Sequence, residues 1–273
     1  MLENFKMLVL KSPLKKYNSR KQNLLFLGAN MKKKLICLII FSSIITIIIY
    51  SAFKNDKITI LALGDSIAHG ITPYNSQSYS YNDYLKEHYE KNHQINKYYR
   101  EFTGIDIRTN DLINMINNNI SKKINGKTIT IQQALVKSDI ITISIGSYDL
   151  YNHLGITNGG TPIKNKEELN DYFLSMFTDL NNLIKLVSKY TAGRIIIIGF
   201  HNPKLDIYEK YHQIFEYLDA SYQKISEEND VEYVSINQEI SGNSKYLPNS
   251  NSIHFDYKAH EIISQKIIRK LDS

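Results

Sequence analysis

The chain has 273 residues, of which 42% are hydrophobic and 22% are charged, and its formal net charge at pH 7 is +6. This composition is ordinary for a folded protein and excludes wholesale disorder. The single cysteine excludes an internal disulfide and also the metal sites that need several cysteine ligands.

The positive charge is concentrated at the N-terminus. Residues 1–34 carry nine Lys and Arg side chains against one acidic side chain, so this segment has a charge of +8 and the rest of the chain has −2. A nucleic-acid-binding surface needs its basic groups on the folded domain. The distribution therefore argues against nucleic acid as a partner.

The N-terminal region contains an uncharged apolar run over residues 35–53. Its 19 residues are about enough to cross a bilayer core as a helix. Three lysines at 32–34 precede it, and positively charged flanks stay on the cytoplasmic side. We therefore expect 1–34 to be a basic cytoplasmic arm, 35–53 to be a single-pass membrane anchor, and 54–273 to be one extracytoplasmic domain.

A cleaved signal peptide is the alternative interpretation of the same run, and it would make the domain secreted. The best candidate cleavage site follows Ala52, but Tyr50 is too large for the small residue expected two positions earlier. Met31, followed by the lysines, also resembles a natural start, so residues 1–30 are either a cytoplasmic extension or a start-site artefact.

Short apolar runs after residue 54 predict the strands of one sheet. They are 58–63, 98–102, 140–145, 194–198 and 231–236. Most of these runs are continuously apolar rather than alternating, which is typical of parallel strands that are covered on both faces.

Helical patterns lie between these runs. Asn165 is followed by Glu168, which is a helix-start pattern, and apolar residues then recur at spacings of three and four until Gly193. The same spacing of apolar residues predicts helices over 205–228 and 257–271. Strands that alternate with helices predict a three-layer α/β/α fold with a parallel sheet, in which ligands bind at the carboxyl ends of the strands.

Two polar features occupy such positions. Gly64-Asp65-Ser66 follows the first strand, where a tight turn can expose the serine hydroxyl, although Asp-Ser is also a common helix N-cap. His254 precedes the last helix on a loop, where a histidine is often an ordinary surface residue. Together they suggest a nucleophile and its base.

The order of these and two further blocks resembles that of the GDSL/SGNH hydrolase family. The blocks are Gly64-Asp65-Ser66, Gly104 after the second strand, Gly146-Ser147-Tyr148-Asp149 after the third, and His254. The resemblance covers residues 56–273 and is to the lipase/acylhydrolase branch of Gram-positive bacteria. It implies a flavodoxin-like α/β/α fold and the hydrolysis of esters without a metal or organic cofactor.

Carried over to the matching positions, the resemblance makes Ser66 the nucleophile and His254 the general base. The backbone N–H groups of Ser66 and Gly104 would form part of the oxyanion hole, which binds the substrate oxygen as it gains negative charge.

Two positions depart from the family pattern. Tyr148 stands where the family has an asparagine that donates to the oxyanion, and we keep it as the third oxyanion-hole residue because its hydroxyl can still donate, although that group lies further from the backbone than an asparagine amide. Asn251 stands three residues before His254, where the family has the aspartate that orients the histidine. Asn251 can accept a hydrogen bond but cannot stabilise the imidazolium by charge. Asp256 is a substitute orienting residue if its side chain points toward His254.

Other polar residues near these blocks have structural interpretations. We expect Asp65 and Asp149 to hold their loops through backbone N–H groups and His260 to pack within the last helix. His69 lies beside the serine turn, where it either faces the cleft or serves local structure. Residues 201–203 follow the fourth strand and are expected at the rim of the cleft.

Two functional classes are compatible with these site residues. The first is an extracytoplasmic serine esterase that acts on lipid acyl groups or on acetylated cell-wall sugars. The second is a cell-surface binding or scaffolding protein that keeps the fold with weakened catalysis. Ser66, Gly104 and His254 favour the first, whereas Tyr148 and Asn251 favour the second.

Overall fold

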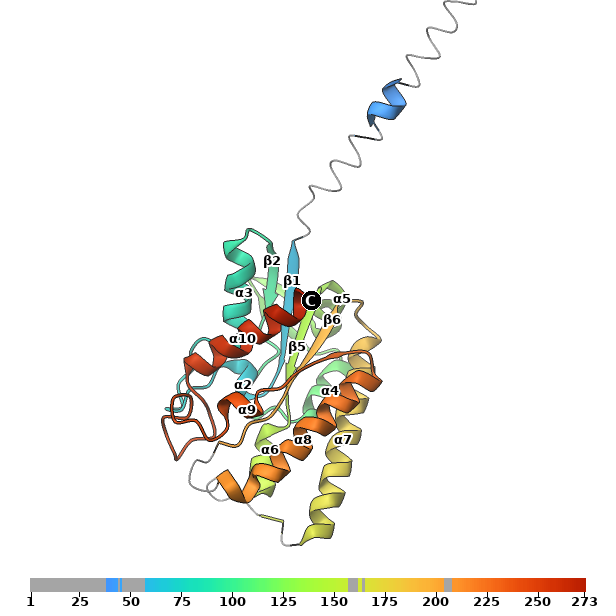
Figure 1. Cartoon of the computed structure of the whole chain (residues 1–273). Coiled ribbons are helices and arrows are strands. Elements are labelled where there is room, and N and C mark those ends of the chain that lie inside the picture. Colours follow the sequence, from blue (N-terminus) through green and yellow to red (C-terminus); the bar gives the residue numbers. More distant parts are fainter. Residues whose placement is uncertain (1–37, 44, 46–56, 157–161, 164, 204–207) are drawn as a thin grey trace, which may run out of the picture. The chain divides into compact units, whose positions relative to one another are not determined.

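A computed structural model describes residues 38–43, 45, 57–156, 162–163, 165–203 and 208–273 (Figure 1). The chain divides into two compact units, Met1–Asp56 and Lys57–Ser273.

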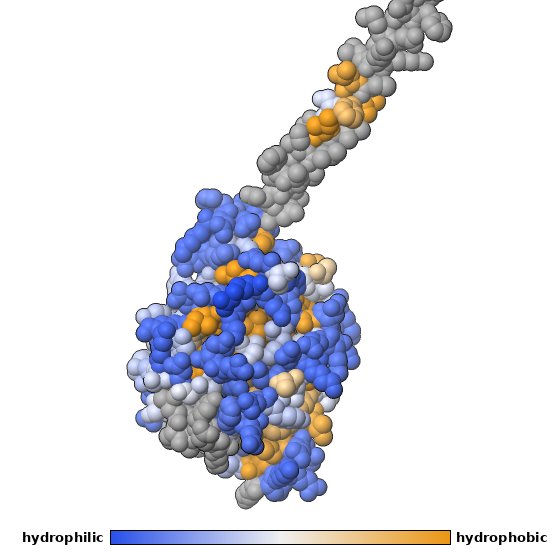
Figure 2. Space-filling view, in the orientation of Figure 1, coloured by the Kyte–Doolittle hydropathy of each residue, from blue (hydrophilic) through white to orange (hydrophobic). Residues whose placement is uncertain are grey.

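In the first unit, residues 38–43 and 45 are helical. Their side chains are exposed and mostly apolar, and they include Leu38 and Phe41 (Figure 2). Most of the predicted span 35–53 and all of the basic arm lie outside the described residues. Within the part of the chain that the structure describes, no helix has the length and apolar character needed to cross a membrane. The anchor therefore stays a prediction.

The second unit is built on a five-stranded parallel sheet with the order β2-β1-β5-β6-β7. The strands are β1 (Ile58–Gly64), β2 (Ile95–Tyr99), β5 (Ile140–Ser144), β6 (Arg194–Ile198) and β7 (Glu232–Val234). Numbered by their sequence among the parallel strands, this order is 2-1-3-4-5, which is the flavodoxin-like arrangement. The expected fold class is therefore confirmed.

Helices cover both faces of this sheet (Figure 1). Along β1, Ile60 packs into the apolar cluster on one face and Leu61 into the cluster on the other, because successive side chains of a strand point in opposite directions. One face is covered by α3 (Tyr81–Lys91) and α10 (Tyr257–Leu271), and the other by α4 (Thr109–Asn117), α5 (Ile131–Lys137), α7 (Lys166–Ser188) and α8 (Tyr208–Glu228).

The structure departs from the predicted strands most clearly at β2 and at an additional hairpin. The expected run 98–102 is strand only at its start, because the chain turns at Arg100, whose carbonyl accepts from the Thr103 N–H at 3.1 Å. The antiparallel hairpin of β3 (Ser121–Ile124) and β4 (Lys127–Thr130) was not predicted, since most of its side chains are polar and exposed.

Three short helices start beside the carboxyl ends of the strands. They are α2 (Ser66–His69), α6 (Ser147–His153) and α9 (Asn237–Ile240). The first two follow β1 and β5, which are neighbours in the sheet. The serine block and the Gly146 block therefore meet at one edge of the sheet, as parallel pairing requires.

Candidate active site

The turn between β1 and α2 carries Ser66. Gly64 has φ +126°, and a Cβ atom at this position would lie 1.8 Å from the Ser144 carbonyl oxygen. Only glycine fits here, since the backbone conformation and the close approach both exclude a side chain. Asp65 is the N-cap of α2 and accepts from the Ile67 N–H at 3.1 Å. The N-cap interpretation and the nucleophile interpretation of Asp-Ser are thus compatible.

The carboxylate of Asp65 is fully buried and joins two strand ends. It accepts from the Ser144 hydroxyl at 3.3 Å, from the Ser147 N–H at 3.4 Å and from the Ser147 hydroxyl. Burial raises its pKa to about 6, because loss of water costs the charged form more than these hydrogen bonds return. Asp65 therefore holds its loop through backbone N–H groups, as expected, and ties it to the start of α6.

Ser66 and His254 are 188 residues apart in the sequence, and the fold brings them together. The His254 Nε2 lies 3.0 Å from the Ser66 Oγ, which is hydrogen-bond distance. Burial lowers the pKa of His254 to about 4, so the imidazole is neutral at neutral pH and can accept the serine proton. This is the arrangement that activates a serine as a nucleophile.

The other ring nitrogen of His254 is buried and has no hydrogen-bond partner among the described residues. Asn251 is exposed, and its backbone N–H donates to the Asn249 side chain at 3.1 Å. The Asp256 carboxylate caps α10, accepting from the Lys258 N–H at 3.0 Å and from the following N–H. Neither expected orienting residue therefore contacts the His254 Nδ1, and among the residues that the structure describes no carboxylate offsets the effect of burial on the pKa of His254.

The two backbone N–H groups expected in the oxyanion hole differ in whether they are free to bind a substrate oxygen. The Ser66 N–H is at the first position of α2, where an N–H has no acceptor within the helix. The Gly104 N–H donates to the Gly64 carbonyl oxygen at 3.0 Å, which extends the pairing with the last residue of β1 beyond the end of β2. A substrate oxygen could use Gly104 only after this hydrogen bond breaks.

Tyr148 lies in the first turn of α6 and is 36% exposed. The guanidinium carbon of Arg108 lies 5.7 Å from the centre of its ring, and the Arg108 Nε lies 3.2 Å from the Asp149 carboxylate. Burial raises the pKa of Asp149, and Arg108 opposes that rise. Asp149 thus forms an ion pair rather than the backbone contacts expected of it, and Tyr148 presents its ring to a cation.

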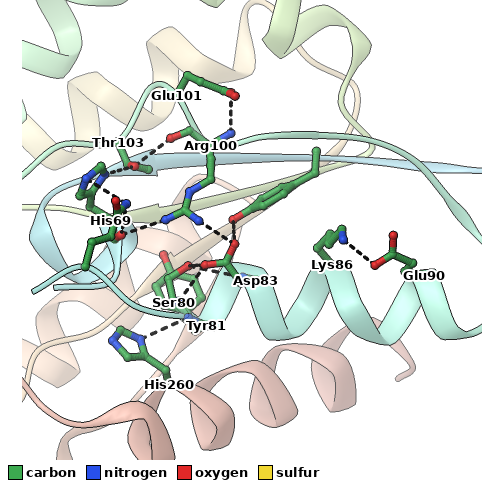
Figure 3. A network of polar contacts seen from close by, with 12 residues as sticks. His69, Ser80, Tyr81, Asp83, Lys86, Glu90, Arg100, Glu101, Thr103 and His260 are labelled. Carbon is green, nitrogen blue, oxygen red and sulfur yellow. Dashed lines mark hydrogen bonds and ion pairs between the residues drawn. The ribbon is translucent and has the colours of Figure 1, made fainter. Parts of the chain in front are cut away.

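His69 belongs to a polar network beside the serine turn (Figure 3). Its Nδ1 lies 2.9 Å from the Thr103 hydroxyl, and its Nε2 accepts from the Gln77 side-chain amide at 3.1 Å. Arg100 donates to the His69 carbonyl oxygen at 3.1 Å and to Asp83 at 3.0 Å. Both ring nitrogens are occupied, so His69 serves local structure: it joins α2 to the turn that precedes Gly104.

His260 is buried in α10 and packs, as expected (Figure 3). Its Nδ1 accepts from the Tyr81 N–H at 3.2 Å, which satisfies a backbone donor in the first turn of α3. Burial lowers its pKa to about 3.

A pocket of about 340 Å³ opens beside the proposed base. Aliphatic and amide side chains form much of its wall. It is lined by Pro73, Asn75, Ile156, Asn249, Asn251, Ser252, Ile253 and His254. A second pocket, of about 290 Å³, lies next to Gly146 and is lined by charged and polar groups that include Arg108, Asp149 and Asp179.

Sequence reasoning missed several residues that build this site. Ser144 and Ser147, which bind Asp65, sit where the third buried run ends, and polar residues at a carboxyl strand end were the available signal. Ser252 accepts from the His254 N–H at 3.1 Å, and its position two residues earlier is a common local turn pattern. Nothing in the sequence pointed to Arg108 as the partner of Asp149.

The comparisons with known proteins agree with the fold and identify the family. The family model for GDSL-like lipase/acylhydrolase matches residues 60–267. No curated protein sequence matches the chain significantly.

Three solved structures illustrate the likeness in fold. A lipase, Lip_vut3 from a goat rumen metagenome, is 16% identical, with a TM-score of 0.58 over 78% of this chain and 97% of that one. A lipase/acylhydrolase from Enterococcus faecalis is 14% identical, with a TM-score of 0.54 over 78% and 94%. A catalytic variant of Axe2, an acetylxylan esterase from Geobacillus stearothermophilus, is also 14% identical, with a TM-score of 0.54 over 78% and 94%.

The family match spans most of the second unit and includes all four sequence blocks. The chain therefore belongs to the GDSL-like lipase/acylhydrolase family and is a hydrolase of the esterase/lipase type.

Proposed function

We propose that this hydrolase cleaves esters with Ser66 as the nucleophile and His254 as the general base. The observation that carries the proposal is the distance of 3.0 Å between the Ser66 Oγ and the His254 Nε2. His254 takes the serine proton as Oγ attacks the acyl carbon, and then gives that proton to the departing alcohol. Water repeats the sequence on the acyl-enzyme and releases the acid.

The site contains fewer supporting groups than this chemistry ordinarily uses. Loss of one oxyanion donor costs roughly 10²–10³ in turnover, and loss of charge on the orienting residue of a serine protease costs about 10⁴. These costs do not add simply, because the groups act as a unit. We infer a slow esterase whose rate is limited by the unpartnered side of His254 and by the engaged Gly104 N–H.

The proposed substrate is an ester with a short acyl group, such as an acetylated cell-wall sugar, with lipid acyl esters as the alternative. The pocket beside His254 is at the small end of the usual range for ligand sites. One structural neighbour is an acetylxylan esterase and two are lipases or acylhydrolases. The apolar run 35–53 after three lysines supports a domain that works outside the cytoplasmic membrane.

A fluorophosphonate probe tests the nucleophile, because only an activated serine reacts with it readily. We expect labelling of the wild type and of Ser121→Ala, which changes an exposed serine in β3, and none of Ser66→Ala. The same three proteins should be assayed with p-nitrophenyl acetate and p-nitrophenyl palmitate. Equal labelling of Ser66→Ala would place the chemistry elsewhere.

A binding protein with weakened catalysis is the second candidate. It is favoured by the His254 Nδ1, which has no hydrogen-bond partner among the described residues. It predicts that the folded wild type is neither labelled nor active on either ester. Faster hydrolysis of acetate than of palmitate would instead support the short-acyl proposal.

A further inference from the structure

His201 packs against the loop that carries His254, with contacts to the residues on both sides of His254. It follows β6 by three residues and is completely buried. Its Nε2 lies 3.1 Å from the carbonyl oxygen of Ile253, the residue that precedes the proposed base. A carbonyl oxygen only accepts, so His201 is the donor and carries its proton on Nε2.

The opposite side of the ring faces α6. The Tyr151 hydroxyl lies 3.1 Å from the His201 Nδ1 and 2.8 Å from the His201 carbonyl oxygen. The Tyr151 hydroxyl donates to the carbonyl oxygen and can share that proton with Nδ1, so both contacts are compatible with the Nε2–H form. Burial lowers the pKa of His201 to about 3, so the ring keeps this form at neutral pH.

The residue after the base also packs on His201. The Phe255 ring meets the His201 ring at an angle of 67°, with 4.9 Å between their centres. Ile253 and Phe255, on either side of His254, are therefore both held by one buried side chain, while the His254 ring points to Ser66.

We propose that His201 is the positioning residue for His254. It fixes the backbone on both sides of the base, a role that in ordinary Ser–His sites belongs to a hydrogen bond on the histidine Nδ1. The need for it follows from the described structure, where the His254 Nδ1 has no partner. This inference rests on the proposed function, because it assigns His201 a part in that reaction.

The test compares two substitutions at His201. His201→Leu removes the donor but leaves the Tyr151 hydrogen bond, which goes to the backbone carbonyl. His201→Gln keeps an N–H donor at similar reach. We expect kcat of His201→Leu to fall by about 10²-fold, since displacement of a reacting group by about 1 Å has an effect of that size. KM should change less than threefold, as His201 is not among the residues that line the pocket beside His254. His201→Gln should recover kcat to within about tenfold of the wild type.

His260→Leu is the matched control. His260 is also a buried histidine, and its ring lies 4.7 Å from that of Phe255, but its hydrogen bond goes to the Tyr81 N–H and not to the loop. We expect this control to lose stability while kcat stays within threefold of the wild type. Equal kcat losses in the two leucine variants, or no recovery in His201→Gln, would overturn the positioning role.

Hydrogen exchange separates this inference from the proposed function. The amides of residues 252–255 should exchange about tenfold faster in His201→Leu than in His260→Leu, while those of β1 exchange alike. That result would support the positioning of the loop even if the fluorophosphonate probe showed the wild type to be inactive. Unchanged exchange at 252–255 in folded His201→Leu would overturn the inference even with a fully active wild type.

Discussion

The carboxylate of Asp65 is hydrogen-bonded to both the backbone N–H and the hydroxyl of Ser147, 82 residues further along the chain. This contact joins the turn after β1 to the start of α6. This buried side chain therefore adds to the pairing of β1 and β5 in fixing the position of Ser66 relative to the Gly146 block.

Substitutions at Asp65 should separate its hydrogen bonds from its charge. Asp65→Ala removes the N-cap and the acceptor for two serines, and we expect it to lower the free energy of unfolding by about 2–4 kcal/mol. Asp65→Asn keeps an acceptor and removes a buried charge, so its loss at pH 7 should stay within about 1 kcal/mol. Urea unfolding monitored by circular dichroism measures both, and similar losses in the two variants would contradict this account.

The pH dependence of hydrolysis reports on His254. Only the neutral imidazole accepts the serine proton, so kcat/KM should rise as the pH rises through about 4 and be level from pH 6 to 8. The measurement is kcat/KM for p-nitrophenyl acetate between pH 3.5 and 8. An acid limb at pH 6.5 or above would show that a partner or water offsets the effect of burial.

Asn251→Asp should strengthen the base. A carboxylate on the wall of the same pocket favours the imidazolium, so the acid limb should move to higher pH and kcat should rise, by at most about 10⁴-fold. Asn75→Asp is the matched control, because it adds the same charge to another part of this pocket wall. If both variants shift the limb equally and neither gains in kcat, position 251 has no orienting role.

Protein stability should fall as the solution is made acidic. Burial depresses the pKa values of His201, His254 and His260, so below pH 6.5 the unfolded chain binds protons that the folded chain does not. Asp65 acts in the opposite direction: its raised pKa stabilises the fold at low pH, and this contribution is lost as the pH rises through about 6. Between pH 6 and 4.5 the three histidines lower the free energy of unfolding more than Asp65 raises it.

The net effect in that window is a loss of roughly 2–3 kcal/mol for each pH unit, since each group contributes about 1.4 kcal/mol. Urea midpoints at pH 7, 6, 5 and 4.5 measure it. Asp65→Asn should give a steeper dependence, because the opposing group is gone. Midpoints that do not change down to pH 4.5 would contradict the assigned burial of the histidines.

Alanine substitutions at two glycines with positive φ test how tightly the turn that carries Ser66 is packed. Gly126, in the exposed hairpin, has φ +78°, and an added Cβ would meet no atom within 4 Å. Gly126→Ala should cost only the backbone strain of about 1–2 kcal/mol. Gly64→Ala adds a clash with the Ser144 carbonyl, and we expect several kcal/mol of destabilisation or failure to fold. Thermal unfolding of both variants tests this, and equal losses would show that the turn relaxes.

Much of the fold was determined by local sequence. The continuous apolar runs at 58–63, 140–145 and 194–198 became β1, β5 and β6, because a buried parallel strand needs apolar side chains on both faces. The last helix has the predicted bounds, 257–271, since its spacing of apolar residues matches the helical repeat. The pairing of Ser66 with His254 was also predictable, from the blocks that identify the family.

The tertiary structure alone decided how those residues are supported. Sequence spacing put Asn251 near His254, yet Asn251 is exposed and makes no hydrogen bond to the His254 Nδ1. Sequence order put Gly104 near Ser66, yet its N–H donates to the Gly64 carbonyl oxygen. His201, which contacts the backbone beside the base, lies 52 residues from Ile253. Side-chain direction and hydrogen bonds between distant segments depend on how the layers pack, and no local pattern of residues carries that information.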